Sequence, residues 1–571
     1  MRLIIREYIS MLKESKELDA LLVTLLLSMG IDPWSRPQIG VRQDGVDIAA
    51  TGKDPDDGKI KVFLFVIKQG DIDRGAWSSG KQSVRPSLEE VLDVYVPNRI
   101  PPEFSGLPVK IVLCCGGIMR QEVEPNWSGF AKTHTKRLVQ LSFWGADNLT
   151  ILLEKHLLNE FIFPVTSQKQ LRKVLATIGD PSAGIEHFSQ MVAFLLKDAK
   201  PSSIKKAVKT LKTINLGLQI LFHWCQEENN LNPAYLASER TLLSVWDWLR
   251  VNGVWKKKAF IEEFKGVYRT YLKINTAYFA KLRPSCLVQD GLGKYAFPNT
   301  LELHLSAFDS MGRLATYGVN LLYVYASNND EGLLPELDNV ARTLTMMIRN
   351  NPILCSPAYD GHSIEIALVL YLFLSMPKYH AFAKEWIVEM IGKTKFSYSI
   401  GCHYPISTDS FDDLLEMSFK TAKSKEDLTS ISTLFPFLAE FCALLQFSEG
   451  YVRLCSTIEQ TFKHTDLQMW FPDDKTEDFL YNTNAGPNSG ATYCSITLPP
   501  TLIEMQAEVA AVCAKVFDAR QLSCISEGMP SLAVIASRHY RTPMLAYLWQ
   551  QLLISSMPAS TPPVSQGGQN A

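Results

Sequence analysis

The order of apolar and polar positions predicts a first region built from both strands and helices. Two β-branched apolar runs, residues 39–50 and 60–67, flank the turn-forming sequence TGKDPDDGK and predict a hairpin. The continuous apolar run 107–115 ends at two glycines, as expected for a central strand that is covered on both faces. Residues 138–144 alternate more openly and predict a further strand.

Helical patterns surround these strands. Residues 16–29 carry apolar side chains on most faces, with acidic residues near the start, and predict a helix that packs on the sheet. Ser87 and Glu90 have the spacing of a capping box, which predicts a second helix that begins at Ser87. A third helix is expected after residue 144. This order of elements predicts an α/β domain over residues 1–165, with a mixed sheet flanked by helices.

From about residue 166 the pattern changes to apolar residues at three- and four-residue spacing, which predicts helices and few strands. No fixed-period repeat is present, so we expect an irregular, mainly α-helical domain over residues 166–557. The tail 558–571 is of low complexity and is expected to be disordered. The helical segments expected are residues 185–196, 204–224, 239–251, 258–282, 333–349, 362–373, 428–445 and 502–516.

Composition narrows the class of protein. The chain has 571 residues, 46% of them hydrophobic, and a formal net charge of -2, so any nucleic-acid site must be a local one. The 11 cysteines include no C-x-x-C pair, which favours reduced thiols and a cytoplasmic location. The apolar runs 21–29 and 364–376 are shorter than the roughly 20 residues that span a bilayer, and the N-terminus mixes charges. We therefore expect neither a membrane partner nor export.

Lys68 is the first candidate functional residue. Because side chains alternate along a strand, every second residue from Val62 to Lys68 faces the same side, so the lysine ends an apolar row. A lysine there is costly unless it reaches solvent or meets an anion, and the first strand supplies Asp47. Metal-dependent phosphodiester hydrolysis uses such a pair, in which the carboxylate holds a divalent cation and the lysine orients water or neutralises phosphate charge. The alternative is a pair of solvated residues at a sheet edge.

Together with the preceding helix, the step Gln43-x-Gly45-x-Asp47 resembles the PD-(D/E)XK restriction-endonuclease-like nucleases over roughly the first quarter of the chain. The resemblance implies a restriction-endonuclease-like fold, Mg²⁺ or Mn²⁺ as cofactor, cleavage of DNA, and catalytic roles for Gln43, Asp47 and Lys68. It further implies an effector of bacterial restriction or antiphage defence, whose appended domain senses a trigger or a partner. The acidic residue that the family places two positions before the lysine is Val66 here.

A metal site of this kind therefore needs a second carboxylate from another part of the chain. In the family resembled, an acid of the first helix often joins the metal site, and Glu17 matches that position, although it could also only complement the helix dipole. Some members carry a relocated acid on the helix after the lysine strand, which makes Glu90 our first choice as a catalytic and metal-binding residue, with Glu89 beside it. Asp71 and Asp73, just beyond the strand, are the local alternatives.

Local groups of basic residues, taken together with a nuclease-like core, predict contacts with a nucleic-acid backbone, although each group alone is more often a solvated face. The residues concerned are Lys132, Lys136 and Arg137 in the first domain, and Lys205, Lys209 and Lys212 on one predicted helix.

The remaining motifs limit the cofactors and partners. No Cys/His spacing predicts zinc, and no G-x-x-x-x-G-K-[ST] loop is present, so an ATP-driven step would need a partner protein. The partners expected are DNA, a protein that supplies sensing or ATPase activity, or a second copy of the chain. The alternative function is a catalytically degenerate nuclease fold that acts as a nucleic-acid-binding or protein-interaction scaffold, with Val66 as the mark of lost activity.

Overall fold

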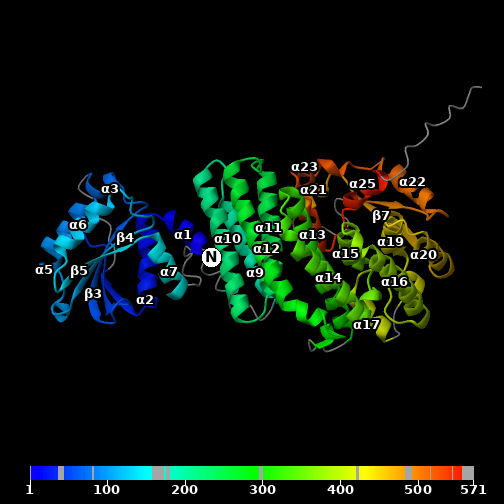
Figure 1. Ribbon diagram of the computed structural model, residues 1–571, viewed down its shortest axis with the longest axis horizontal. Coiled ribbons are helices and arrows are strands. Elements are labelled where there is room, and N and C mark those ends of the chain that lie inside the picture. The colour runs from blue at the N-terminus through cyan, green and yellow to red at the C-terminus, as the bar shows by residue number, and fades with distance from the viewer. Residues whose placement is uncertain are drawn as a thin grey trace, which may run out of the picture. The chain divides into compact units, whose positions relative to one another are not determined.

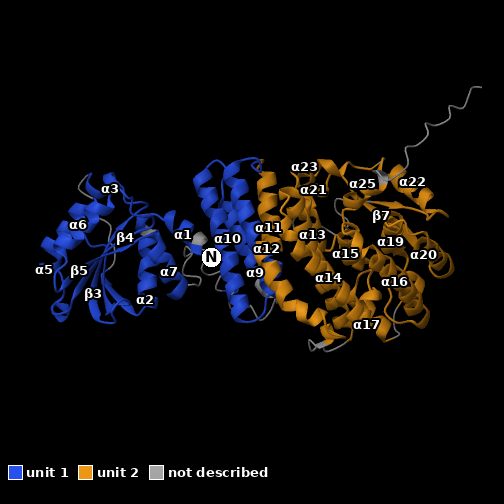
Figure 2. Cartoon of the chain, in the orientation of Figure 1, with its two compact units in different colours: residues 1–238, 254–270 blue, residues 239–253, 271–571 orange. Residues whose placement is uncertain are grey.

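The computed structural model describes residues 2–35, 44–79, 83–156, 173–174, 181–294, 300–419, 423–481, 491–514, 516–542 and 544–555. The chain divides into two compact units (Figure 2). Unit 1 comprises residues 1–238 and 254–270, and unit 2 comprises residues 239–253 and 271–571. The domain boundary expected near residue 165 and the tail 558–571 lie outside the described residues.

Unit 1 contains the mixed sheet that the sequence predicts. Its five strands lie in the order β1-β2-β3-β4-β5, with antiparallel pairing from β1 to β3 and parallel pairing from β3 to β5. The strands are β1 (Ile31–Ser35), β2 (Ile48–Lys53), β3 (Ile60–Lys68), β4 (Val109–Cys115) and β5 (Val139–Trp144). The hairpin and the two later strands are confirmed. The first strand of the hairpin begins at Ile48 instead of residue 39, and β1 was not predicted.

Helices cover both faces of this sheet (Figure 1). One face carries α1 (Arg2–Ser10), the π-helical turn η1 (Glu14–Leu18), α2 (Asp19–Ser28) and α7 (Ala146–His156). The other face carries α3 (Arg74–Ser78), α4 (Val84–Glu90), the π-helical turn η2 (Val91–Tyr95), α5 (Val96–Asn98) and α6 (Glu124–His134). On that second face Val62, Leu64 and Val66 pack with Trp77 and Leu88, so the apolar row of β3 is buried as predicted.

The rest of the chain is mainly helical. The helices are α9 (Pro181–Asp198), α10 (Ile204–Glu227), α11 (Asn232–Val251), α12 (Lys258–Cys286), α13 (Thr300–Asn328), α14 (Leu334–Asn350), α15 (Ser363–Leu374), α16 (His380–Ile400), α17 (Phe411–Ser418), α18 (Lys425–Leu428), α19 (Leu434–Leu444), α20 (Ser448–Thr461), α21 (Thr476–Phe479), α22 (Leu502–Cys513), α23 (Ser523–Ser526), α24 (Ser531–Tyr540) and α25 (Tyr547–Ser555). Unit 2 also holds a three-stranded sheet that was not predicted, made of β6 (Ile431–Ser432), β7 (Asp466–Pro472) and β8 (Ala491–Ser495).

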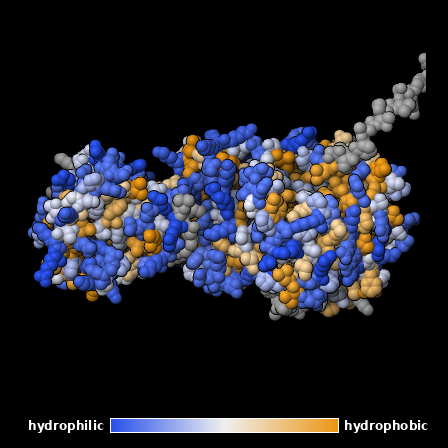
Figure 3. Space-filling view, viewed as in Figure 1, coloured by the Kyte–Doolittle hydropathy of each residue, from blue (hydrophilic) through white to orange (hydrophobic). Residues whose placement is uncertain are grey.

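Helix α15 explains the longest apolar run of the sequence. Its residues from Ser363 to Phe373 are all buried, so the run is a core helix surrounded by other helices of unit 2. Within the described part of the chain, no helix combines the length and the apolar character needed to cross a bilayer. Hydrophilic residues predominate on the face of the molecule drawn in Figure 3, with smaller hydrophobic areas between them.

Candidate functional site

Asp47 and Lys68 lie at the same edge of the first sheet, where β3, β4 and β5 end; we call it the carboxyl edge. Lys68 is the last residue of β3, and Asp47 immediately precedes β2, which runs antiparallel to β3. The Asp47 amide donates to the Phe65 carbonyl at 2.9 Å, and the Ile67 amide donates to Asp47 Oδ2 at 2.7 Å. The carboxylate is therefore fixed against the backbone of β3.

A tight turn delivers Asp47 to this position. Asp44 and Gly45 both adopt left-handed backbone conformations, with φ of 48° and 81°. A Cβ atom at Gly45 would lie 2.3 Å from the Ser87 carbonyl oxygen, so this position needs glycine where the turn meets α4. Asp44 is buried and pairs with Arg99 at 2.9 Å, which holds the start of the turn.

The Asp47 carboxyl carries an uncompensated charge. Burial raises the pKa of Asp47 to about 6, and the charges of Glu14 and Asp19 act in the same direction. The Ile67 amide and the Lys68 ammonium oppose this rise in the pKa without cancelling it. Glu14 lies in η1 and Asp19 begins α2, so the helices before the sheet bring two further carboxylates towards Asp47. From the sequence, Glu14 and Asp19 are explained by the helix dipole, and an effect on Asp47 was not predicted.

Glu17 has a structural role in place of the predicted metal-binding one. Its Oε2 accepts from the Lys13 amide at 2.8 Å and from Lys209 Nζ at 2.7 Å. Burial alone would raise the pKa of Glu17, but these contacts outweigh it and lower the pKa. Glu17 thus joins η1 to α10, and this correction removes it from the candidate metal ligands.

The structure also corrects the prediction for Glu90. Helix α4 begins at Val84, with Ser83 before it, and the Ser87 hydroxyl donates to the Ser83 carbonyl at 3.0 Å inside the helix. The capping box predicted at Ser87 is therefore wrong, and Glu90 is the last residue of α4 instead of lying in its first turn. Glu90 is not among the charges that shift the pKa of Asp47, which are those of Lys68, Glu14 and Asp19.

The other local acids are engaged elsewhere. Asp71 accepts from the Ile118 amide at 3.0 Å and pairs with Arg120 at 2.6 Å. Asp73 accepts from the Ala76 amide at 2.8 Å and caps α3. Glu89 pairs with Arg85, one turn earlier in α4. None of these contacts brings an oxygen ligand to Asp47.

Two further positions bear on a metal site. Gln43 lies outside the described residues. Val66, where the family resembled has an acid, is fully buried in the apolar layer between the sheet and α4. Among the described residues, no group of three or more His, Cys, Asp or Glu side chains is placed to hold a metal ion. Asp47 with a neighbouring acid could hold one only if water or substrate supplied further oxygens, which is how Mg²⁺ commonly binds.

Lys136 and Arg137 lie far from Asp47. They line a cavity of about 260 Å³ together with Pro108 and Val109 at the start of β4. Because β3, β4 and β5 are parallel, their first residues form the opposite edge, which we call the amino edge. Lys132 is exposed on α6. Lys136 and Arg137 therefore do not line the site at Asp47, and the contact with a nucleic-acid backbone stays a prediction for all three cations.

The lysines of α10 are used largely in ion pairs within unit 1. Lys209 pairs with Glu17 as described, and Lys212 pairs with Glu7 at 2.8 Å and with Glu263 at 3.7 Å. Lys205 is exposed. The predicted stripe of three phosphate contacts is thus reduced to one lysine that is open to solvent.

A buried ion network at the amino edge was not predicted. Lys110, the second residue of β4, is 1% exposed and pairs with Asp54 at 3.0 Å and with Asp56 at 2.5 Å. Lys61 pairs with the same Asp54 at 2.6 Å and with Asp57 at 2.8 Å. The signal in the sequence was a lysine inside a continuous apolar strand, since such a residue needs a buried anion.

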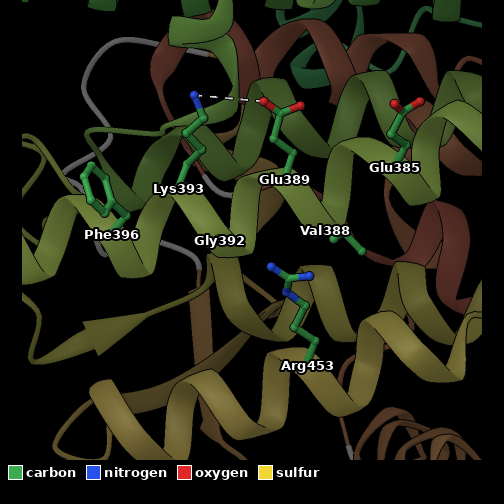
Figure 4. Close-up of a pocket in the computed structure, with 7 residues that line it drawn as sticks. All are labelled: Glu385, Val388, Glu389, Gly392, Lys393, Phe396 and Arg453. Carbon is green, nitrogen blue, oxygen red and sulfur yellow. Dashed lines mark ion pairs between the residues drawn. The ribbon is translucent and has the colours of Figure 1, made fainter.

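Unit 2 has a groove of its own, of about 580 Å³, between α16 and α20 (Figure 4). Arg453 of α20 points towards Gly392 and Val388 of α16, and Glu389 pairs with Lys393 at 4.0 Å on the same helix. The lining carries both signs of charge. It gives no preference for an anionic or a cationic ligand.

Comparison of the chain with protein-family models, with curated proteins and with solved structures gave no match. The assignment of function therefore depends on the geometry of the residues described above.

Proposed function

We propose that the α/β domain of unit 1 is a metal-dependent deoxyribonuclease related to the PD-(D/E)XK nucleases. The observation that carries the proposal is the excess of negative charge at the carboxyl edge, where burial and two neighbouring acids raise the pKa of Asp47 to about 6 beside Lys68. A bound divalent cation relieves such an excess, since it stabilises the ionised carboxylates that repel one another. Perturbed carboxyl groups of this kind are concentrated at functional sites.

Each residue of the proposed metal site would have a separate role. Asp47 and one of Glu14 or Asp19 would hold Mg²⁺ or Mn²⁺, and water and a DNA phosphate would complete its coordination. The ion, when bound, supplies Lewis-acid stabilisation of the phosphate. Lys68 places an ammonium group beside Asp47, where it orients the attacking water or neutralises charge that develops on the phosphate. The Asp44–Asp47 turn holds the carboxylate in place through Gly45.

The biological setting we propose is restriction or antiphage defence, with the helical part of the chain as the element that senses a trigger or a partner protein. The support is the resemblance at the step Gln43-x-Gly45-x-Asp47 together with the succession of a mixed α/β sheet and a mainly helical region. A helical region without an ATP-binding loop fits a sensing role better than a motor role.

Cleavage of plasmid and linear DNA by the purified full-length chain, with Mg²⁺ or Mn²⁺ and with EDTA, tests the proposal. We expect Asp47→Asn and Lys68→Ala each to lower the metal-dependent rate by about a hundredfold or more. Lys53→Ala is the matched control, because Lys53 is exposed at the far end of β2. Wild-type rates in both site variants would refute the assignment.

A second function is favoured by one observation. Val66 is buried where the family has an acid, and the described residues contain no three-acid group. The α/β domain could then bind nucleic acid without cleaving it, as a degenerate nuclease scaffold. Salt-dependent binding of DNA without cleavage by the wild-type chain, in either metal, identifies this alternative.

A further inference from the structure

The amino edge of the first sheet carries a cavity of about 260 Å³ that the proposed nuclease function does not use. It is formed where β3, β4 and β5 begin, and the turn that follows α6 closes one side. Strand β4 has seven residues, so this cavity lies roughly 20 Å along the sheet from the end that carries Lys68. A group bound here is not the group that reacts at Asp47.

The charges that line the cavity favour an anion. The buried Lys61 ammonium is held by Asp54, by Asp57 and, at 3.1 Å, by Gln140 Oε1, so Lys61 and Asp57 offset each other. The remaining charged lining residues are the cations Lys59, Lys136 and Arg137, all exposed. Within the described residues, neither Lys136 nor Arg137 forms an ion pair.

The backbone turn that carries Lys136 and Arg137 is closed by its own hydrogen bonds. The Lys136 amide donates to the Val139 carbonyl at 2.9 Å, and the Val139 amide donates back to the Lys136 carbonyl at 3.1 Å. The Val109 amide donates to the Leu138 carbonyl at 2.8 Å, which fastens this closed turn to β4. A preorganised turn lowers the entropy lost on binding.

The cavity also has an apolar wall. Leu138 is 59% exposed, which is unusual for a leucine at the start of a strand, and Pro108 and Val109 lie beside it. The volume lies just below the range of about 300–1,000 Å³ typical of small-molecule sites. A cationic rim beside a small apolar wall fits a phosphate group attached to a compact, partly apolar body.

We propose that this cavity is a binding site for a nucleoside monophosphate, with the phosphate on Lys136 and Arg137 and the sugar and base against Leu138. Arginine and lysine bind phosphate through charge-assisted hydrogen bonds, and arginine does so with two parallel donors. Lys59 completes the cationic rim. The proposal does not depend on nuclease activity, because the site and its ligand are separate from Asp47.

Isothermal titration of the full-length chain with adenosine monophosphate, adenosine and inorganic phosphate tests the site. We expect adenosine monophosphate to bind most tightly and adenosine without its phosphate to bind at least about tenfold more weakly. Lys136→Gln and Arg137→Gln, singly, are expected to weaken binding of the monophosphate by about tenfold each. Lys132→Gln is the matched control, since Lys132 is exposed on the same segment but does not line the cavity.

Two oligonucleotides that differ only in a 5′-phosphate serve as the competing probe. Tighter binding of either oligonucleotide than of adenosine monophosphate, abolished by the same variants, would overturn the proposal in favour of a DNA-backbone contact. Unchanged affinity in both variants, or equal binding of adenosine, would also overturn it. Lys59→Gln gives an independent variant outside the turn, with the same expected loss, and equal melting temperatures of all variants show that their folds are intact.

Discussion

The two edges of the first sheet shift the pKa values of their buried carboxylates in opposite directions. At the amino edge, Asp54 meets the ammonium groups of Lys61 and Lys110 at 2.6 and 3.0 Å. Burial alone would raise the pKa of Asp54, but these contacts outweigh it and the pKa is lowered. At the carboxyl edge, burial raises the pKa of Asp47 to about 6; Glu14 and Asp19 add to the rise, and the Ile67 amide and Lys68 oppose it only in part.

This difference separates a structural ion network from a candidate reactive one. A buried charge whose partners are complete stabilises the fold and gains little from an added ion. A carboxylate that remains short of positive charge costs stability, and a cation from solution can recover that cost. The raised pKa of Asp47 therefore fits the cation site that we propose at the carboxyl edge. The ion pairs of the amino edge stabilise the core instead. Among the described residues, Lys136 and Arg137 of the cavity beside that core form no ion pair.

The largest effect on stability should come from the buried ion network at the amino edge, where Asp54 is paired with two lysines. Asp54→Ala leaves the buried Lys110 and Lys61 short of a partner and should lower the free energy of unfolding by about 3–5 kcal/mol. Chemical denaturation at pH 7 measures this loss. Asp57→Ala, which removes a partly exposed partner of Lys61, is the control and should cost less. Equal, small losses in both variants would show that the network is not structural.

The second prediction concerns Asp47, whose pKa is raised, whereas that of Asp54 is lowered. Because the folded pKa is raised from 3.8 to about 6, the stability contributed by Asp47 is present below about pH 4 and is lost as the pH rises through 6. Asp47→Asn should therefore raise the free energy of unfolding at pH 7, by about 1–2 kcal/mol, and flatten its dependence on pH between 4 and 6. A loss of stability at pH 7 would contradict the charge excess.

The smallest effect is expected at Glu17, an acid near the carboxyl edge that has found a partner. Lys209→Gln removes the half-buried ion pair and should cost about 0.5–1 kcal/mol of stability at pH 7. Lys205→Gln, on the same helix but exposed, should stay within about 0.5 kcal/mol of wild type. Urea unfolding compares the two, and an equal response would remove the structural role given to Glu17.

Much of the fold of both units follows from the local pattern of apolar and polar residues. The hairpin, β4, β5 and the core helix α15 were predictable because their apolar runs match strand or helix periods and end at turn residues. Strand β1 was not predicted because Ile31–Ser35 includes Pro33 and shows no alternation of apolar and polar residues. The start of α4 was misplaced because Ser83 and Ser87 offer competing caps one turn apart.

The site was predictable only in part, and for physical reasons. Asp47 immediately precedes β2 and Lys68 ends β3, which pairs with β2, so their proximity follows from the hairpin. Glu17 was misassigned because its partner Lys209 is 192 residues away in the sequence, beyond any local pattern. A π-helical turn at η1 also changes which residues share a helix face, so the acids that act on Asp47 could not be chosen by a 3.6-residue period.

The titration of Asp47 tests the central claim most directly. Difference infrared spectra of the wild-type chain against Asp47→Asn, recorded between pH 4 and 8, isolate the protonation of this one carboxyl group. We predict a midpoint near pH 6 without divalent cations, as the structure gives, and a clear fall in that midpoint when Mg²⁺ is added. A midpoint near the ordinary value of about 4, unchanged by Mg²⁺, would contradict a cation site at the carboxyl edge.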